Sequence, residues 1–316
     1  MDLLMESIYT FDIGGSSVKH SLIVFESFNK YHINEYPIIS IENSNFKNLE
    51  RIIIETIKNF LEINNVITTI GISTAGSVDE NGIVLNSGYI SNYTNIDWSS
   101  TIKSLFPRIR NVLVMNDGRA SAWAEYSGRK LDLKSLVHFV IGTGIGGATI
   151  INGQFLNGED GFAGCFGHIK TGENYNIKCS CGKFGCLETT SSSKSMVERF
   201  NNINNTNFTL SEIIYKAQKS DIRATQIFEE GGKNLGIIIG SILNVINPKI
   251  VTIGGGLIEA FIDFNFDVFF KIALQKALEN GHHRVTSKVI IKYAQYGNKG
   301  GMLGVALKCL ESFHSK

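Results

Sequence analysis

Short apolar runs alternate along the chain with longer stretches in which apolar residues recur every three or four positions. Runs of β-branched and other apolar residues predict strands, and they occupy residues 8–13, 20–25, 69–73, 112–115, 136–140, 147–151 and 250–253. The helical spacing of Leu49, Ile53, Ile57, Phe60 and Leu61 predicts a helix of about five turns with one core-facing side. A second long helix is expected over residues 224–245, because Asn247 and Pro248 then end it.

Alternating strands and helices predict an α/β fold. An opening strand, a hairpin-like return and a later strand recur after residue 136, so we expect two similar lobes. A chain of 316 residues with 43% hydrophobic content can bury a core in each lobe. The first lobe is expected over residues 1–118, with a last helix over 302–316 packing back on it, and the second over 119–301.

Composition narrows the classes of partner and compartment. The formal net charge of +1 gives no broad field that would attract nucleic acid or an anionic membrane. The start of the chain does not resemble a secretory leader and no apolar run reaches membrane-spanning length, so we expect a cytoplasmic protein. Three of the five cysteines fall within residues 179–186, which favours a metal site in a reducing compartment over a disulfide framework.

Two glycine-rich turns follow predicted strands. The first contains Asp12, Gly14, Gly15 and Ser16, and the second contains Gly142, Thr143, Gly144 and Gly146. Backbone amides in such turns can approach phosphate oxygens, and the hydroxyls of Ser16 and Thr143 add donors. Either turn alone is equally well explained as a tight hairpin, but two of them favour a bound triphosphate. Asp12 is then the candidate for orienting Mg²⁺ or its waters.

A third glycine cluster, with Gly254 and Gly255, follows the strand at 250–253 and could let an adenine or ribose approach closely. The second turn also matches the spacing of a dinucleotide-binding fingerprint. That fingerprint should open a helix, whereas residues 148–151 read as a strand that ends in a hairpin turn at 152–153. A P-loop motif is absent from the sequence.

Four side chains of the kind that zinc prefers as ligands lie within a stretch of 19 residues. They are His168, Cys179, Cys181 and Cys186. Four protein ligands leave no open coordination position, so we predict a structural zinc site that fixes the surrounding loop. Scattered core thiols are the competing interpretation of these cysteines, and Cys309 is expected to be an ordinary buried thiol.

Asp117 is the candidate general base for phosphoryl transfer, which needs a carboxylate to accept the proton of the attacking hydroxyl. It follows the strand at 112–115, so it should lie at the carboxyl end of that strand, beside Asn116. A role as the N-cap of the next helix is the competing interpretation of Asp117.

The sequence resembles the ROK family of repressors, open reading frames and kinases over nearly the whole chain. The resemblance rests on five stretches in order, namely residues 12–16, 71–79, 116–117, 142–147 and 167–188. It implies a two-lobed, actin-like (ribonuclease H-like) fold with an active-site cleft between the lobes, ATP with Mg²⁺, and a sugar as phosphate acceptor. Asp117 would be the base, and the residues contacting the sugar would be Gly76, Asn116, His168 and Glu188. Members are commonly homodimers or higher homo-oligomers.

One position departs from the family pattern. Kinases of this family commonly have Glu-x-Gly-His before the zinc ligands, whereas this chain has Cys165 in the place of the glutamate. A lost acceptor for a sugar hydroxyl predicts a shifted specificity. The acceptor class stays open among glucose, N-acetylmannosamine, N-acetylglucosamine and β-glucosides.

Two other functions are compatible with the resemblance. A sugar-sensing repressor would need a DNA-binding domain ahead of the first glycine turn, which begins at residue 12, and a basic footprint that the charge balance lacks. A sugar-binding or regulatory ROK protein with weak or no kinase activity is the second alternative. Asp117 and the two glycine turns favour the kinase.

Overall fold

The computed structural model describes residues 6–28, 30–41, 45–88, 90–129, 133–172 and 177–314. Their contacts form two compact units. The first unit contains the described residues up to 129, together with 157–162 and 299–314, and the second contains 133–156 and 163–298. The first unit thus includes residues 119–129, beyond the predicted lobe boundary, and residues 315 and 316 of the predicted last helix lie outside the described part.

The first unit is built on a mixed sheet with the strand order β3-β2-β1-β5-β8. Strands β1, β2 and β3 form an antiparallel meander, whereas β5 runs parallel to β1 and β8 runs parallel to β5. The strands of this unit are β1 (Glu6–Ile13), β2 (Ser17–Ser27), β3 (Lys30–Glu35), β4 (Ile39–Ser40), β5 (Thr69–Thr74), β6 (Ser77–Val78), β7 (Val84–Asn86) and β8 (Asn111–Asn116).

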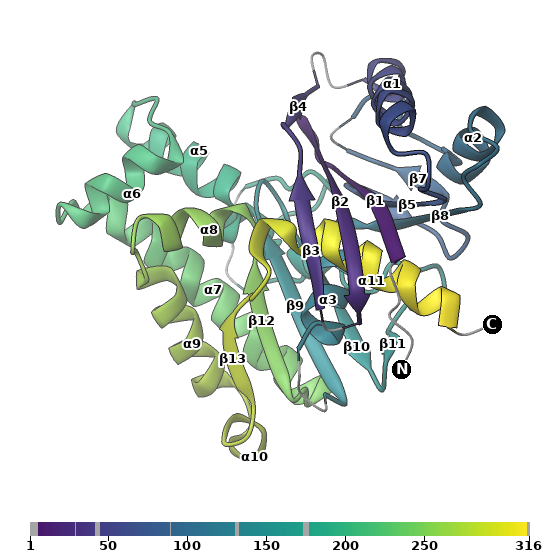
Figure 1. The fold of residues 1–316 in the computed structure, drawn as a ribbon. Helices are drawn as coiled ribbons and strands as arrows, with labels where there is room; N and C mark the ends of the chain where they lie inside the picture. The colour runs from purple at the N-terminus through teal and green to yellow at the C-terminus, as the bar shows by residue number, and fades with distance from the viewer. Residues whose placement is uncertain are drawn as a thin grey trace. The chain divides into compact units, whose positions relative to one another are not determined.

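Residues along β1 alternate between the two faces of this sheet, as the period of a strand requires. Tyr9, Phe11 and Ile13 belong to the core that helices α1 (Phe46–Ile63) and α2 (Trp98–Leu105) complete. The other face packs against α11 (Gly300–His314), which also contacts α3 (Asp117–Ser127) (Figure 1). Asp12 points to this second face, toward the beginning of α11.

Helix α1 confirms the prediction made from its apolar spacing. It has 18 residues, and the five buried residues are the five that set the spacing. The helix begins after Asn45, whose side chain accepts a hydrogen bond from the backbone N–H of Asn48 at 3.0 Å.

The sheet of the second unit repeats the topology of the first, with the order β11-β10-β9-β12-β13. Strands β9, β10 and β11 form an antiparallel meander, and β12 and β13 follow in parallel. The prediction of two similar α/β lobes is therefore confirmed. These strands are β9 (Ser135–Ile141), β10 (Ile145–Ile151), β11 (Gln154–Phe155), β12 (Ile250–Gly254) and β13 (Ile290–Tyr293).

Helices cover the second sheet, and the longest is α7 (Ile222–Ile246), which packs along α9 (Val268–Asn280) (Figure 1). Helix α7 ends where the sequence predicts, because Asn247 takes a left-handed conformation with φ of 48° and Pro248 follows. The other helices of this unit are α4 (Glu188–Ser191), α5 (Ser193–Asn204), α6 (Leu210–Gln218), α8 (Gly256–Asp263) and α10 (His283–Thr286).

The second glycine turn does not have the structural context of a dinucleotide-binding fingerprint, because a strand and not a helix follows it. Residues 142–144 join two antiparallel strands, and the next turn, at Asn152 and Gly153, has positive φ at both residues. Within the described ranges, no helix is both long and apolar enough to span a membrane.

Candidate functional site

Asp12 lies at the end of β1, and three groups of the first unit surround its carboxylate. The hydroxyl of Ser73 donates a hydrogen bond to Oδ1 at 2.8 Å, because parallel pairing sets Ser73 directly beside Asp12. Lys19, its partner in the antiparallel register, places its ammonium 3.8 Å from Oδ2. A Cβ added to Gly301 in the first turn of α11 would lie 2.7 Å from Oδ1, so the glycine lets this helix N-terminus approach the carboxylate.

Asp117 is the first residue of α3, and Asn116 is the N-cap. The competing interpretation of Asp117 as the cap is therefore wrong. The Asn116 side chain accepts from the backbone N–H of Arg119 at 3.1 Å and donates to Asp117 Oδ1 at 2.8 Å and to the Gly76 carbonyl at 2.9 Å. The Gly118 N–H donates to the same Oδ1 at 2.8 Å. These bonds fix the carboxylate at the carboxyl end of β8.

Burial and, to a smaller extent, the nearby negative charge of Asp12 raise the pKa of Asp117 to about 6. The hydrogen bonds from Gly118 and Asn116 oppose this shift. The pKa of Asp12 is also raised, mainly by burial, although Lys19 and Ser73 counteract the effect. The first unit therefore brings together two carboxylates of which one titrates near neutral pH, as a general base requires.

Gly76 follows β5 with φ of +113°, and a Cβ there would lie 2.5 Å from the Asn86 carbonyl oxygen. Only glycine fits this position. The start of the turn is held by Tyr93, whose hydroxyl lies 3.0 Å from Thr74 Oγ1 and accepts from Trp98 Nε1 at 2.7 Å. The carboxyl ends of β1, β5 and β8 therefore lie at one edge of the first sheet, and this edge carries Asp12, Gly76, Asn116 and Asp117.

The first glycine turn, Gly14 to Ser16, joins β1 to β2 in the same unit. The Gly14 N–H donates to the Ser17 carbonyl at 2.9 Å, and Ser16 is exposed at the tip. The second turn occupies the equivalent place between β9 and β10 in the second unit, where Thr143 is exposed.

The second turn has open space above it. A Cβ added to Gly142 or Gly146 would meet no atom within 4 Å, so a ligand could approach the backbone there. Gly255 lies beside this turn with φ of +97°, and a Cβ there would lie 2.5 Å from the Ile141 carbonyl oxygen. The second unit thus brings the predicted Gly254–Gly255 cluster next to the turn at 142–146, because β12 pairs in parallel with β9.

The predicted metal ligands lie together in the second unit. The ligand atoms of His168, Cys179, Cys181 and Cys186 are all within 4.8 Å of one another. Cys181 Sγ and Cys186 Sγ are 3.6 Å apart, and His168 Nδ1 is 3.5 Å from Cys179 Sγ. A tetrahedral zinc ion would separate two sulfurs by about 3.8 Å and a sulfur from a nitrogen by about 3.6 Å. The ligand set therefore fits zinc, and Nδ1 is the histidine atom that would bind it.

The surroundings of the ligand set also suit zinc. Lys170 Nζ lies 3.1 Å from Cys186 Sγ, where its positive charge would offset the excess negative charge of three thiolates around a divalent ion. Gly182 and Gly185 have φ of +82° and +72° and form the turns between the last ligands. Cys309 is buried on α11 in the other unit, as expected.

Glu188 begins α4, two residues after the last metal ligand. Its Oε2 accepts from the Ile145 N–H at 3.0 Å and its Oε1 accepts from Ser180 Oγ at 3.1 Å. Cys165, in the place of the family's glutamate, is exposed at the start of the short helix Phe166–His168 that carries the histidine ligand.

Sequence reasoning missed Lys19 and Ser73, which contact Asp12 only through strand register. A signal for Lys19 was available, because a hairpin about residues 14–16 pairs position 19 with position 12. It also missed the link from Glu188 to Ile145, which joins residues 43 positions apart.

The model of the family described as "ROK family" matches residues 8–311. The N-acetyl-D-glucosamine kinase of Pasteurella multocida (strain Pm70) is 28% identical over 310 residues, covering 94% of this chain and 97% of that protein.

Several solved structures share the fold, and two of them differ in described role. A ROK-family glucokinase from Streptomyces griseus, in complex with glucose and AMPPNP, has a TM-score of 0.77 at 22% identity, covering 95% of this chain and 98% of that one. A ROK-family transcriptional regulator, homologous to the E. coli MLC protein, has a TM-score of 0.81 at 23% identity, covering 97% of this chain and 78% of that one.

Proposed function

This chain belongs to the ROK family, and on that basis we propose that it transfers the γ-phosphoryl group of ATP to a hydroxyl of a hexose or N-acetylhexosamine. The observation that carries the proposal is the paired setting of Asp12 and Asp117, in which Asp117 has a pKa raised to about 6. Curated relatives include an N-acetylglucosamine kinase of nearly the same length.

Asp117 is the base in this proposal. The hydrogen bonds from Asn116 and Gly118 both fall on Oδ1, so we assign Oδ2 to the proton of the attacking sugar hydroxyl. A base with this pKa is largely ionised at neutral pH, and it still gains a proton readily as the hydroxyl attacks. The cap at Asn116 keeps the carboxylate in place without protonating it.

The nucleotide would be held by backbone amides and hydroxyls of the two glycine turns, at Gly14, Gly15 and Ser16 and at Gly142, Thr143, Gly144 and Gly146. The Gly254–Gly255 turn, which is adjacent to the second of these within its unit, would take the adenosine part. Magnesium bound with the nucleotide would neutralise phosphate charge, and Asp12 is the residue that would bind it or its waters. Lys19 and Ser73 would keep Asp12 oriented and ionised for this task.

Zinc at the His168 site would have a structural role, because its four protein ligands complete a tetrahedron.

The proposed contacts of the sugar are Gly76, Asn116, His168 and Glu188. With Cys165 in place of a glutamate, we expect weak discrimination in favour of glucose. Thiolate ligands require reducing conditions, which supports a cytoplasmic site of action, and a homo-oligomeric state is the family expectation.

A panel of sugars tests the proposed function. Release of ADP should be stimulated by at least one of glucose, N-acetylglucosamine, N-acetylmannosamine and a β-glucoside. Asp117→Asn should reduce kcat by about 10²-fold or more while sugar affinity stays within about twofold. The exposed control Asp263→Asn should leave kcat unchanged.

The similarity in fold to a transcriptional regulator makes a sugar-binding regulator the second candidate. The panel distinguishes the two functions. Binding of a sugar by calorimetry without any sugar-stimulated ATP turnover would support the regulator and contradict the kinase.

A further inference from the structure

The carboxylate of Glu188 spans two loops of the second unit that are far apart in sequence. Oε2 accepts a hydrogen bond from Ile145, the residue that ends the second glycine turn and begins β10. Oε1 accepts from Ser180, which lies between the metal ligands Cys179 and Cys181, and Cys179 Sγ is 3.9 Å from the same oxygen. One side chain therefore ties the metal loop to the glycine turn.

The other end of the turn is held by the same short segment. Ser193 donates from both its backbone N–H, at 2.8 Å, and its hydroxyl, at 2.7 Å, to the Gly142 carbonyl. Ser193 follows Glu188 by five positions, and the hydroxyl of Ser195 donates to the Glu188 carbonyl at 2.7 Å. The segment 188–193 thus contacts Gly142 and Ile145, which lie on either side of Thr143 and Gly144 in the turn between β9 and β10.

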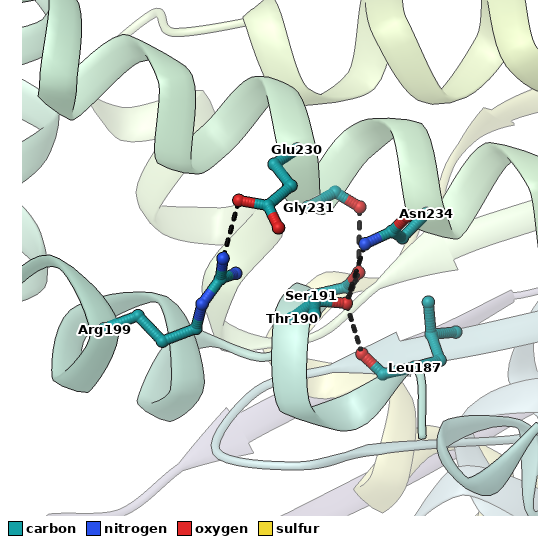
Figure 2. Close-up of polar contacts among 7 residues, drawn as sticks. All are labelled: Leu187, Thr190, Ser191, Arg199, Glu230, Gly231 and Asn234. Atoms are coloured by element: carbon teal, nitrogen blue, oxygen red, sulfur yellow. Dashed lines mark hydrogen bonds and ion pairs between the residues drawn. The ribbon is translucent and has the colours of Figure 1, made fainter. Parts of the chain in front are cut away.

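Buried polar groups anchor this segment to α7 (Figure 2). The Ser191 hydroxyl donates to the Gly231 carbonyl at 2.8 Å, and Asn234 Nδ2 donates to Thr190 Oγ1 at 3.1 Å. Ser191, Thr190 and Asn234 have no exposed surface. In Figure 2, an ion pair of 2.6 Å between Arg199 and Glu230 adds a second tie from α5 to α7.

A segment fixed in this way cannot easily follow the metal loop if that loop loses its shape. The described parts of the metal loop, residues 169–172 and 177–187, contain no strand or helix and only isolated bridges at Lys170–Cys186 and Lys178–Phe184. Four metal bonds would hold it. When they are lost, Ser180 should move away from Glu188, while the backbone of 188–193 stays anchored to α7. The Glu188 carboxylate is then held at Oε2 alone, so its side chain gains freedom and its contact with Ile145 should loosen.

We propose that Glu188 is a positioning residue that couples the metal loop to the glycine turn, so that zinc at His168, Cys179, Cys181 and Cys186 strengthens nucleotide binding. The proposal rests on the proposed function in one respect, namely that the turn at 142–146 binds the nucleotide. Coupling between two binding sites is reciprocal, so the nucleotide must strengthen zinc binding by the same factor.

The first experiment measures the Kd of MgADP by calorimetry, without sugar, for the zinc-loaded full chain and for the chain depleted of zinc by a chelator. Removal of zinc should weaken binding by about tenfold in the wild type, the size expected from one hydrogen bond to a charged group. In Glu188→Ala the ratio should fall to near one. In Ser180→Ala, which removes only the contact on the metal side, it should fall to about threefold.

Matched controls are Glu229→Ala and Ser241→Ala, two exposed positions of α7, and both should keep the wild-type ratio. The second experiment uses only loaded protein, so it does not depend on the depleted chain staying folded. A chromophoric chelator competes for zinc with and without saturating MgADP, and the nucleotide should raise zinc affinity about tenfold in the wild type but not in Glu188→Ala.

The outcomes separate the coupling from the proposed function. If the zinc-loaded wild type binds MgADP but zinc affinity does not respond to the nucleotide, the coupling is wrong and the function stands. An equal response in wild type and Glu188→Ala would also overturn the role of Glu188. If the zinc-loaded wild type binds no MgADP at all, the proposed function and the coupling both fall.

Discussion

At the scale of single residues, Asp117 must be ionised to accept a proton. Its pKa of about 6 means that the carboxylate becomes protonated within a pH range in which activity can be assayed. We therefore expect kcat/KM for the sugar, at saturating MgATP, to fall as pH drops through about 6. At pH 5 it should be about one tenth of its value at pH 7.5. Full recovery on return to pH 7.5 would exclude irreversible inactivation, and an unchanged circular dichroism spectrum at pH 5 would exclude unfolding. A flat profile between pH 5 and 7.5 would contradict the assignment of Asp117 as base.

The raised pKa of Asp117 also predicts a stability effect. The native state binds this proton more tightly than the unfolded chain, so the wild type loses stability as pH rises from about 4 to about 6. Asn cannot ionise, and Asp117→Asn should therefore raise the melting temperature at pH 7.5 by roughly 2–6 °C. The gain should shrink at pH 4.5, and the exposed variant Asp263→Asn should show none. An equal rise in melting temperature at both pH values would show that the ionisation of Asp117 is not its cause.

Substitutions of Cys165 test whether this position determines which sugar the protein prefers. A carboxylate at this position could accept a hydrogen bond from a sugar hydroxyl, a contact worth about 1–3 kcal/mol. Cys165→Glu should therefore raise kcat/KM for glucose at least about fivefold relative to the wild type, whereas Cys165→Ser should not. If both variants match the wild type across the sugar panel, position 165 does not determine specificity.

The site residues that could be predicted are those that a short stretch of sequence identifies without knowledge of the tertiary contacts. Asp12 lies near the end of a strand and Asp117 directly follows one, and the four predicted metal ligands lie within 19 residues. Lys19, Ser73 and the Glu188–Ile145 contact were missed because cross-strand register and long-range loop contacts decide them. Asn116 as the N-cap was missed because Asp is as good a cap as Asn, and only the backbone geometry separates the two.

At the scale of elements, the long helices and the buried strands were predictable because their apolar pattern is set by the core they face. Strand β3 and strand β13 were not predicted. β3 is largely exposed along its length and has no apolar run, and β13 is an edge strand of only four residues with a short apolar run. Their positions come from pairing with β2 and β12, which a local pattern does not encode.

The α7–α9 pair gives a prediction for helix packing. A Cβ added to Gly236 would lie 2.4 Å from the Ala273 carbonyl oxygen and 2.6 Å from Lys276 Cβ. Gly236→Ala should destabilise the second unit by about 1–3 kcal/mol in spite of the better helix propensity of alanine. Denaturation followed by circular dichroism measures this change. The exposed Ser241→Ala on the same helix should change stability by less than about 0.5 kcal/mol, and an equal effect of both variants would contradict close packing of this pair.

At the scale of the whole molecule, two units share one topology and have separate hydrophobic cores. The first core contains Ile53 and Trp98, and the second contains Phe228 and Ile239. The chemistry is divided in the same way. Both carboxylates belong to the first unit, and the metal ligands and Glu188 belong to the second.

This division predicts where loss of zinc acts. Both tryptophans of the chain, Trp98 and Trp123, are buried in the first unit, so tryptophan fluorescence reports that unit alone, whereas circular dichroism reports both. Chelation of zinc should lower the melting midpoint seen by circular dichroism, or add an earlier transition, because the four proposed metal bonds would organise a loop of the second unit. The fluorescence midpoint should move by less than about 1 °C. Re-addition of zinc should restore the dichroism curve, and an equal shift in both signals would show that the metal stabilises the chain as a single cooperative unit.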